Sequence, residues 1–266
     1  MRTFAATLAG GSRNQDRYVI GENFAAVLDG ATSVAGDRSH DPGWFAQQLA
    51  DSLARTIPEG GPLAEHVEHA IRDVRDAHSL QTDTAPTSTI AIARWASASV
   101  ETYVLGDSPA VIVHPDGSAS VHTDERLAAV AVGQRATYRS NLAAGHGYGG
   151  QHRQTLLELQ AEQAEQRNRP GGYWIAGTDP SAAQHGITAT TPTHEVAALI
   201  LASDGVALER HPNAESWAEL CAGVQRHGPD SVLRQIHDVE DTDPDGLRWP
   251  RSKPHDDKTI VIAIPS

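Results

Sequence analysis

Aspartates recur at the ends of short apolar runs, and their carboxylates are the residues of this chain best suited to chemistry. Three of them follow such a run beside glycine or serine, one stands just before the last run, and one follows Asn14-Gln15 early in the chain. The five are Asp16, Asp29, Asp107, Asp204 and Asp256. A single aspartate or glycine at a strand end is an ordinary turn former. Repetition beside very apolar strands indicates more than turns.

Adjacent strands of one sheet bring their ends together, so we expect these carboxylates to converge at one sheet edge. Converging carboxylates repel one another, and the arrangement is costly unless cations neutralise it. Mg²⁺ and Mn²⁺ are hard cations that prefer such oxygen ligands. Two of them held about 3.5–4 Å apart suit phosphoryl hydrolysis, because they activate a bridging water and clamp the phosphate. The pattern therefore favours a two-metal hydrolase.

The first part of the chain alternates between blocks of helical and strand patterns. Residues 3–8 and 24–28 are typical of strands, and apolar residues at helical spacing predict helices over 44–57 and 63–80. Four runs with the two-residue period of strands follow, separated by turn signals, and they predict an antiparallel meander. These runs are 89–95, 100–105, 110–114 and 118–122.

The second part begins with a helical stretch after Leu127, a glycine-rich segment at 145–150 that we expect to be flexible, and a polar helix over 151–167. Strands are then predicted at 172–176, 195–202 and 259–264, and helices at 214–224 and 229–239. Strands and helices grouped in separate blocks favour an α+β fold. No linker or repeat divides the sequence, so we expect one domain over 1–266, its sheet closed by the two chain ends.

The composition is that of an ordinary globular protein, with 39% hydrophobic and 21% charged residues and a formal net charge of −13. Such an acidic surface repels nucleic acid and anionic lipid, so neither is an expected partner. The one cysteine, Cys221, cannot form an internal disulfide. Without an apolar run long enough to span a membrane or an evident signal peptide, the expected location is the cytoplasm.

The order of these motifs resembles the PPM family of metal-dependent serine/threonine protein phosphatases, type 2C, in its bacterial form. The resemblance spans residues 14–262. The motifs that carry it are Asn14-Gln15-Asp16, Val27-Leu28-Asp29-Gly30, Gly106-Asp107-Ser108, Ser203-Asp204-Gly205, and Asp256-Asp257 followed by Thr259. Each motif is weak alone, but five in order are specific. The resemblance implies a four-layer α-β-β-α sandwich, two antiparallel sheets flanked by helices.

The resemblance also implies roles for individual residues. Asp29 is expected to bridge two Mn²⁺ or Mg²⁺ ions, with the Gly30 carbonyl on the second ion. Asp204 and Asp256 are expected to hold the first ion, and with Asp29 they form the catalytic set. Asp107 matches the residue that helps hold a third, weaker ion in bacterial members. Asp16 completes the expected metal ligands.

Several positions depart from the family pattern. Gln15 stands where a glutamate is usual, and the place of the phosphate-binding arginine is Gly11. Arg13, two residues later, is therefore the expected phosphate-binding residue. Ala31 replaces the histidine proposed as general acid in eukaryotic members. His255, next to Asp256, is the histidine best placed for phosphate binding or acid catalysis.

The family carries a variable flap near its active site, and residues 128–186 occupy the corresponding interval. The expected activity is hydrolysis of phosphomonoesters by a metal-bridging hydroxide, most directly on phosphoserine or phosphothreonine of proteins. Two alternatives stay open at this point. One is a phosphatase for a small phosphorylated metabolite, and the other is a non-catalytic sensor or binding module on the same fold.

Overall fold

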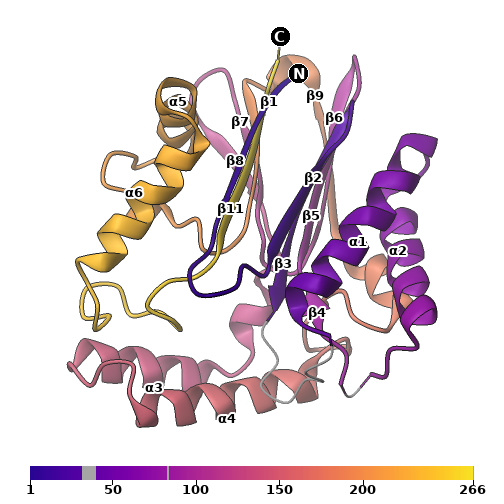
Figure 1. The fold of residues 1–266 in the computed structure, drawn as a ribbon. Helices are drawn as coiled ribbons and strands as arrows, with labels where there is room; N and C mark the ends of the chain where they lie inside the picture. Colours follow the sequence, from indigo (N-terminus) through magenta and orange to yellow (C-terminus); the bar gives the residue numbers. More distant parts are fainter. Residues whose placement is uncertain (32–39, 83, 266) are drawn as a thin grey trace.

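A computed structural model describes residues 1–31, 40–82 and 84–265. Two antiparallel sheets face each other at its centre, and helices cover both outer faces (Figure 1). The α-β-β-α sandwich expected from the sequence is thus confirmed.

The first sheet joins the two ends of the chain. Its strand order is β1 (Arg2–Leu8), β11 (Lys258–Ile264), β10 (Ala198–Ala202), β7 (Ala110–Val113) and β8 (Ala119–His122). Strands β1 and β11 pair antiparallel over their whole lengths, from Arg2 opposite Ile264 to Leu8 opposite Lys258. The termini therefore lie side by side at one end of the sandwich (Figure 1).

The second sheet has two edge strands that the sequence patterns do not indicate. Its order is β2 (Asp16–Ile20), β3 (Phe24–Ala31), β5 (Ile90–Trp95), β6 (Ser99–Leu105) and β9 (Ile187–Pro192), and the short β4 (Thr87–Ser88) pairs with β3. The unforeseen strands, β2 and β9, lie at its edges, where polar residues are common. The strand predicted at 172–176 is wrong, because this segment forms only isolated bridges through Tyr173 and Ala176.

The predicted meander is also wrong, because the chain changes sheets between β6 and β7. Gly106 makes the crossing with a φ of 91°, a conformation that favours glycine. A Cβ at this position would come within 2.8 Å of the Thr89 side chain. The crossing places Asp107 between the two sheets.

Helices α1 (Pro42–Thr56) and α2 (Leu63–His78) cover the second sheet, and α5 (Trp217–His227) and α6 (Pro229–Asp241) cover the first (Figure 1). Short 3₁₀ helices lie at Ile57–Glu59, Glu125–Ala129, Pro180–His185, Thr193–Glu195 and Leu208–Arg210. The core between the sheets includes Val27, Val104, Ile112, Leu201 and Val261. Among the described residues, no helix combines the length and apolarity needed to cross a bilayer.

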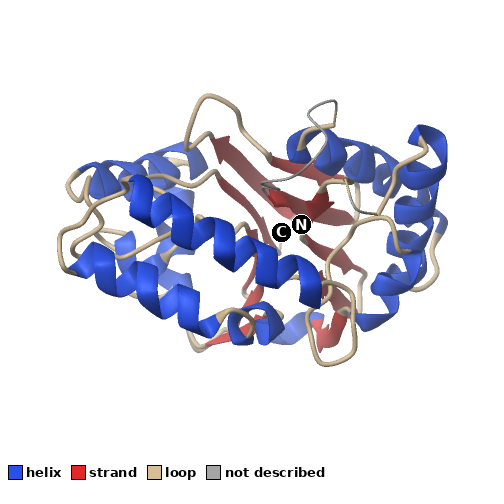
Figure 2. Ribbon diagram, turned by 90° about the horizontal axis from the view of Figure 1, so that it is seen from below, coloured by secondary structure: helices blue, strands red, loops and turns tan. Residues whose placement is uncertain are grey.

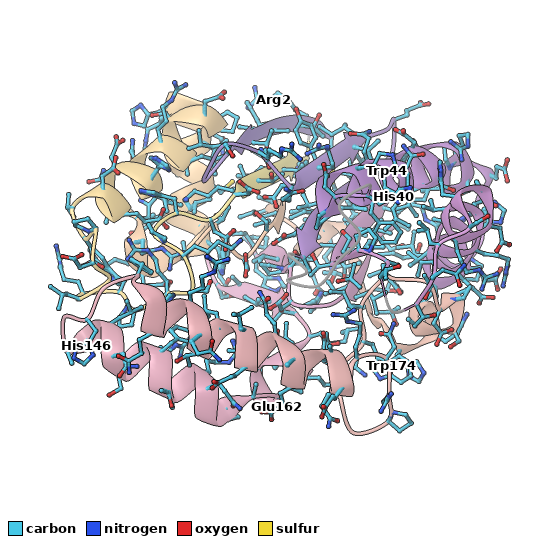
Figure 3. The ribbon with its side chains drawn as sticks, turned by 60° about the horizontal axis from the view of Figure 1, so that its bottom comes forward. Arg2, His40, Trp44, His146, Glu162 and Trp174 are labelled. Atoms are coloured by element: carbon cyan, nitrogen blue, oxygen red, sulfur yellow. The ribbon has the colours of Figure 1, made fainter. Side chains whose placement is uncertain are left out.

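Two further helices, α3 (Val132–Ala143) and α4 (Gly150–Gln166), form a hairpin across one end of the sandwich (Figure 2). His146 marks its turn, and Trp174 lies beyond the opposite end (Figure 3). The segment 145–150, expected to be flexible, is the α3–α4 connection. Its Tyr148 packs against the apolar cluster of Tyr138 and Leu142. This hairpin makes up much of the predicted flap.

Candidate active site

Five carboxylates gather where the ends of the two sheets meet. Asp16 lies opposite Asp29 in the β2–β3 register, and Asp107 follows β6. Asp204 follows β10, and Asp256 precedes β11. The expectation that adjacent strands of one sheet bring them together is therefore wrong, since three come from the second sheet and two from the first. We call this set the carboxylate ring.

Asp29 is fixed by the core. It continues β3 directly from residues 24–28, all of which are buried. Burial raises its pKa well above the ordinary value, and the charges of Asp16, Asp204 and Asp256 raise it further. Gly30 follows, and a side chain there would collide with the backbone of Pro42 at the start of α1. Strand and helix thus hold Asp29 and the Gly30 backbone in place.

Asp16 is the most enclosed member of the ring, with 1% of its surface exposed. Burial raises its pKa to about 6. The hydroxyls of Ser203 and Thr259 oppose this rise, but neither forms a well-aligned hydrogen bond to a carboxylate oxygen of Asp16. A buried carboxylate without hydrogen-bond partners is costly and normally has a cation beside it.

Asp204 and Asp107 complete the ring on its open side. The protein groups packed around the Asp204 carboxyl raise its pKa by shielding it from water, and the charges of Asp256 and Asp107 raise it further. The residue as a whole is nevertheless solvent-exposed, so ions have access to it. Burial likewise raises the pKa of Asp107, while the charge of Arg135 on α3 lowers it. The helical hairpin therefore reaches the edge of the ring.

The adjacent Asp256 and Asp257 have different tasks. Asp257 is buried, and its two oxygens accept hydrogen bonds from the backbone N–H groups of Gly10 and Gln15, each at 2.7 Å. It therefore ties the β1–β2 connection to the start of β11. Asp256 instead points its carboxylate into the ring, where Oδ1 accepts from Lys253 Nζ at 2.6 Å and from the Asp257 N–H at 2.9 Å.

The structure does not bring every expected residue to the ring. The Arg13 side chain is 75% exposed and lies 3.6 Å from Asp41. Gln15 turns its side chain to the start of α1, where Oε1 accepts a 2.5 Å hydrogen bond from the Gly43 N–H. His255 is also committed elsewhere, since its Nδ1 lies 3.1 Å from Glu240 and its Nε2 3.1 Å from Asp241. Within the described part of the chain, none of these three side chains forms a hydrogen bond or an ion pair with a carboxylate of the ring.

A second set of charges lies behind Asp256, and sequence reasoning missed it. Glu240 and Lys258 are both fully buried, with Nζ 2.7 Å from Oε2. Arg210 Nε lies 2.9 Å from the other oxygen of Glu240, and Lys258 also donates a 2.8 Å hydrogen bond to the Asp256 carbonyl. We call Arg210, Glu240, His255 and Lys258 the paired network. Lys258, the first residue of the otherwise apolar strand β11, is the sequence feature that could have indicated a buried ion pair.

The donor set fits divalent cations. All five groups of the ring are carboxylates, the oxygen ligands that Mg²⁺ and Mn²⁺ prefer. Four of them have raised pKa values with burial as the first cause, so charge enters this site only at a cost. Among the described residues, the two oxygens of Asp16 also lack hydrogen-bond partners. Bound cations would offset the negative charge of the ring and would give these oxygens a partner.

Comparison with known proteins defines the class. The family model for protein phosphatase 2C matches residues 5–239, and the chain therefore belongs to that family. It is a metal-dependent protein phosphatase. The match ends before Asp256, so the place of this residue rests on the structure. No sequence among curated proteins matches the chain significantly.

Several solved structures share the fold. The serine/threonine phosphatase Stp1 from Staphylococcus aureus superposes with a TM-score of 0.58 at 14% identity, covering 100% of this chain and 94% of that one. MsPP from Mycobacterium smegmatis, solved with cacodylate, gives 0.58 at 17% identity, covering 100% and 99%. The catalytic domain of PstP, in complex with two manganese ions, gives 0.56 at 17% identity, covering 99% and 97%.

Proposed function

We propose that this chain removes phosphate from phosphoserine or phosphothreonine of proteins, with Mn²⁺ or Mg²⁺ held by the carboxylate ring. The observation that carries the proposal is the ring itself. Carboxylates from both sheets meet at one place, and the most buried of them, Asp16, has no well-formed hydrogen bond. The fold shared with PstP, which binds two manganese ions, supports the same reading.

Within this proposal, each residue of the ring holds cations according to its position. The charges of Asp16, Asp204 and Asp256 all raise the pKa of Asp29 after burial, so Asp29 is close to ligands of both ions and suits a shared ligand. Asp204 and Asp256 would hold one of the ions, and the Gly30 carbonyl would serve the other. Asp107, at the edge facing α3, suits a third and weaker ion. Bound ions of this kind lower the pKa of water and offset charge on phosphoryl oxygens.

The surroundings limit which group protonates the leaving alkoxide. Ala31 has no ionisable side chain, and His255 is committed to two carboxylates of other segments. We therefore assign this proton to solvent. A substrate with an acidic leaving group needs little help from an acid, whereas a serine alkoxide needs more. p-Nitrophenyl phosphate should accordingly turn over faster than a phosphoserine peptide.

The test is hydrolysis of p-nitrophenyl phosphate and of a phosphothreonine peptide, with Mn²⁺, with Mg²⁺ and with EDTA. The wild type should act on both substrates with either metal and lose activity in EDTA. Asp204→Asn should abolish metal-dependent turnover. Asp238→Asn, a matched change on the exposed side of α6, should not.

Two results would count against the proposal. Turnover that persists in EDTA would remove the metal role. Hydrolysis of small phosphate esters without any phosphopeptide hydrolysis would move the substrate class to phosphorylated metabolites.

A further inference from the structure

Lys253 places an ammonium group at the carboxylate ring, on a loop that sequence reasoning did not single out. Its Nζ lies 2.6 Å from Asp256 Oδ1. Its charge also opposes the raised pKa values of Asp29 and Asp204, whose first cause is burial. One ammonium is thus within electrostatic reach of three residues of the ring.

The backbone around Lys253 is held on both sides. Arg251, itself buried, donates to the carbonyls of Trp249 (3.0 Å) and Pro254 (2.8 Å) and pairs with the buried Asp243 at 2.8 Å. The Ser252 carbonyl lies 2.8 Å from Nε2 of His152 on α4. Asp243 is therefore a structural anchor of this loop.

The Lys253 head group is less constrained than its backbone. Its side chain is 45% exposed, and Asp256 accepts the one hydrogen bond that it forms within the described part of the chain. An ammonium has three donors on a flexible stem, so it can turn from Asp256 to another acceptor without moving the loop.

Charge balance gives this head group a task. With its five carboxylates ionised by bound metal, the ring and a phosphoryl dianion carry seven negative charges. Two divalent cations would leave three of these charges unbalanced, and a third cation would still leave one. Three other cations have partners outside the ring, and within the described residues none of them forms a hydrogen bond with a carboxylate of the ring. Arg13 forms an exposed ion pair with Asp41, and Lys258 forms a buried one with Glu240. Arg135 donates hydrogen bonds to the Leu127 and Val130 carbonyls.

We propose that Lys253 is a phosphate-binding residue of this active site, donating to a phosphoryl oxygen once metal ions have taken over its place on Asp256. It fills the role expected of Arg13. This inference rests on the proposed phosphatase function. Lysine is an established phosphate ligand that acts as a point charge, and such charge-assisted hydrogen bonds are stronger than neutral ones.

The experiment compares Lys253→Met with the wild type at saturating Mn²⁺. Calorimetry should show inorganic phosphate binding to the Mn²⁺-loaded protein weakened about tenfold. KM for a phosphopeptide and the inhibition constant of phosphate should rise similarly. Mn²⁺ itself should bind as tightly or more tightly, since a competing ammonium is gone. Lys253→Arg should recover part of the phosphate affinity, because it keeps the charge.

Matched variants separate the alternatives. Arg234→Met removes an exposed cation from α6 and should leave phosphate binding unchanged. If Arg13→Met weakens phosphate binding and Lys253→Met does not, the inference is overturned. It is also overturned if all loss in Lys253→Met disappears when more Mn²⁺ is added. Absence of wild-type turnover would instead contradict the proposed function, a separate result from any change in phosphate affinity.

Discussion

Two groups of charged side chains meet at the start of β11, and they solve the problem of buried charge in opposite ways. In the paired network, Glu240 is surrounded by Lys258, Arg210 and His255. In the carboxylate ring, like charges face one another, and Lys253 is the cation in hydrogen-bond contact among the described residues. Asp256 links the two groups, since its carbonyl accepts a hydrogen bond from Lys258 of the paired network and its carboxylate belongs to the ring.

The difference indicates which of the two clusters is suited to binding metal ions. His237, Glu240 and His255 also bring possible ligand atoms within 4.8 Å of one another. Two cationic side chains already lie against Glu240, so a further cation there meets repulsion. The ring has the reverse balance. Composition of a cluster therefore says less about metal binding than the charge that remains after its protein partners are counted.

Lys258→Met should have the largest effect, and it tests the paired network. The change leaves Glu240 buried with one cation fewer and releases the Asp256 carbonyl. Removing one partner of a buried ion pair costs about 3–5 kcal/mol of unfolding free energy. Urea unfolding in EDTA measures this loss.

The matching double variant sharpens that result. Glu240→Gln combined with Lys258→Met should cost less than the sum of the two single changes, because neither charge is then left without its partner. A loss below about 1 kcal/mol for Lys258→Met would show that the network carries little of the stability.

Asp29→Asn comes next and tests the ring. The variant keeps the shape of the side chain but removes a charge and weakens an oxygen ligand, so Mn²⁺ affinity should fall. Activity should drop at least about 100-fold, which corresponds to roughly 2.7 kcal/mol in the barrier. The metal-free fold should survive, and be slightly more stable, since one of several repelling carboxylates is neutral. Calorimetry with Mn²⁺ and a rate assay measure both quantities.

Asp238→Asn is the control for that comparison. It carries the same chemical change on an exposed face of α6. Asp241, which also looks remote in the sequence, is unsuitable because it lies 3.1 Å from His255. Normal binding of two ions by Asp29→Asn, with an unchanged rate, would remove Asp29 from the site.

The sequence predicts the layers and the meeting of the five aspartates, and for a physical reason. Long apolar strands such as residues 24–28 and 259–264 are buried on both faces, and this pattern does not depend on distant contacts. The metal-binding roles of these aspartates stay a prediction. The edge strand β9 alternates half-buried and exposed residues with little apolar contrast, so it gave no signal. The sheet change at Gly106 depends on packing against Thr89, which is distant in sequence.

Roles that depend on where a side chain points were harder to predict than which segments lie near the site. Arg13 and Gln15 stand close in sequence to Asp16, yet the structure turns them to Asp41 and to the Gly43 N–H. Lys253 and Lys258 lie in a segment where sequence alone gives no partner. Their contacts come from α6 and from the loop at Arg251, which only the folded chain brings together.

The pH dependence of the metal-free protein is the third prediction, and the sign follows from Asp16. Its pKa is raised from 3.8 to about 6, so the folded protein holds this proton at pH values where the unfolded chain releases it. Asp16 alone should therefore lower the free energy of unfolding in EDTA by on the order of 2 kcal/mol as pH rises from about 4 to 6. The raised pKa values of Asp29, Asp107 and Asp204 act in the same direction. Urea titrations across this range measure the combined fall.

Asp16→Asn and Mn²⁺ both sharpen this test. The variant should make this fall shallower between pH 4 and 6, because the contribution of Asp16 is gone while Asp29, Asp107 and Asp204 still titrate with raised pKa values. In the wild-type protein, saturating Mn²⁺ should recover at pH 7 the free energy of unfolding that is lost in EDTA, since ions that bind only the folded state stabilise it. A metal-free stability that rises with pH over this range would contradict the sign assigned to Asp16.

The smallest expected effect concerns the link between the helical hairpin and the loop of Lys253. His152 on α4 is buried, its Nε2 lies 2.8 Å from the Ser252 carbonyl, and the rings of Tyr138 and Tyr148 pack edge-on against it. His152→Ala should loosen this contact without touching the ring, so KM for a phosphopeptide should rise about threefold while that for p-nitrophenyl phosphate changes less. Gln154→Ala, on the exposed side of the same helix, is the matched control. The difference between the two substrates is expected because only the larger substrate extends far enough to contact the hairpin. Equal changes for both substrates would mean that the hairpin supports the loop but does not help select the substrate.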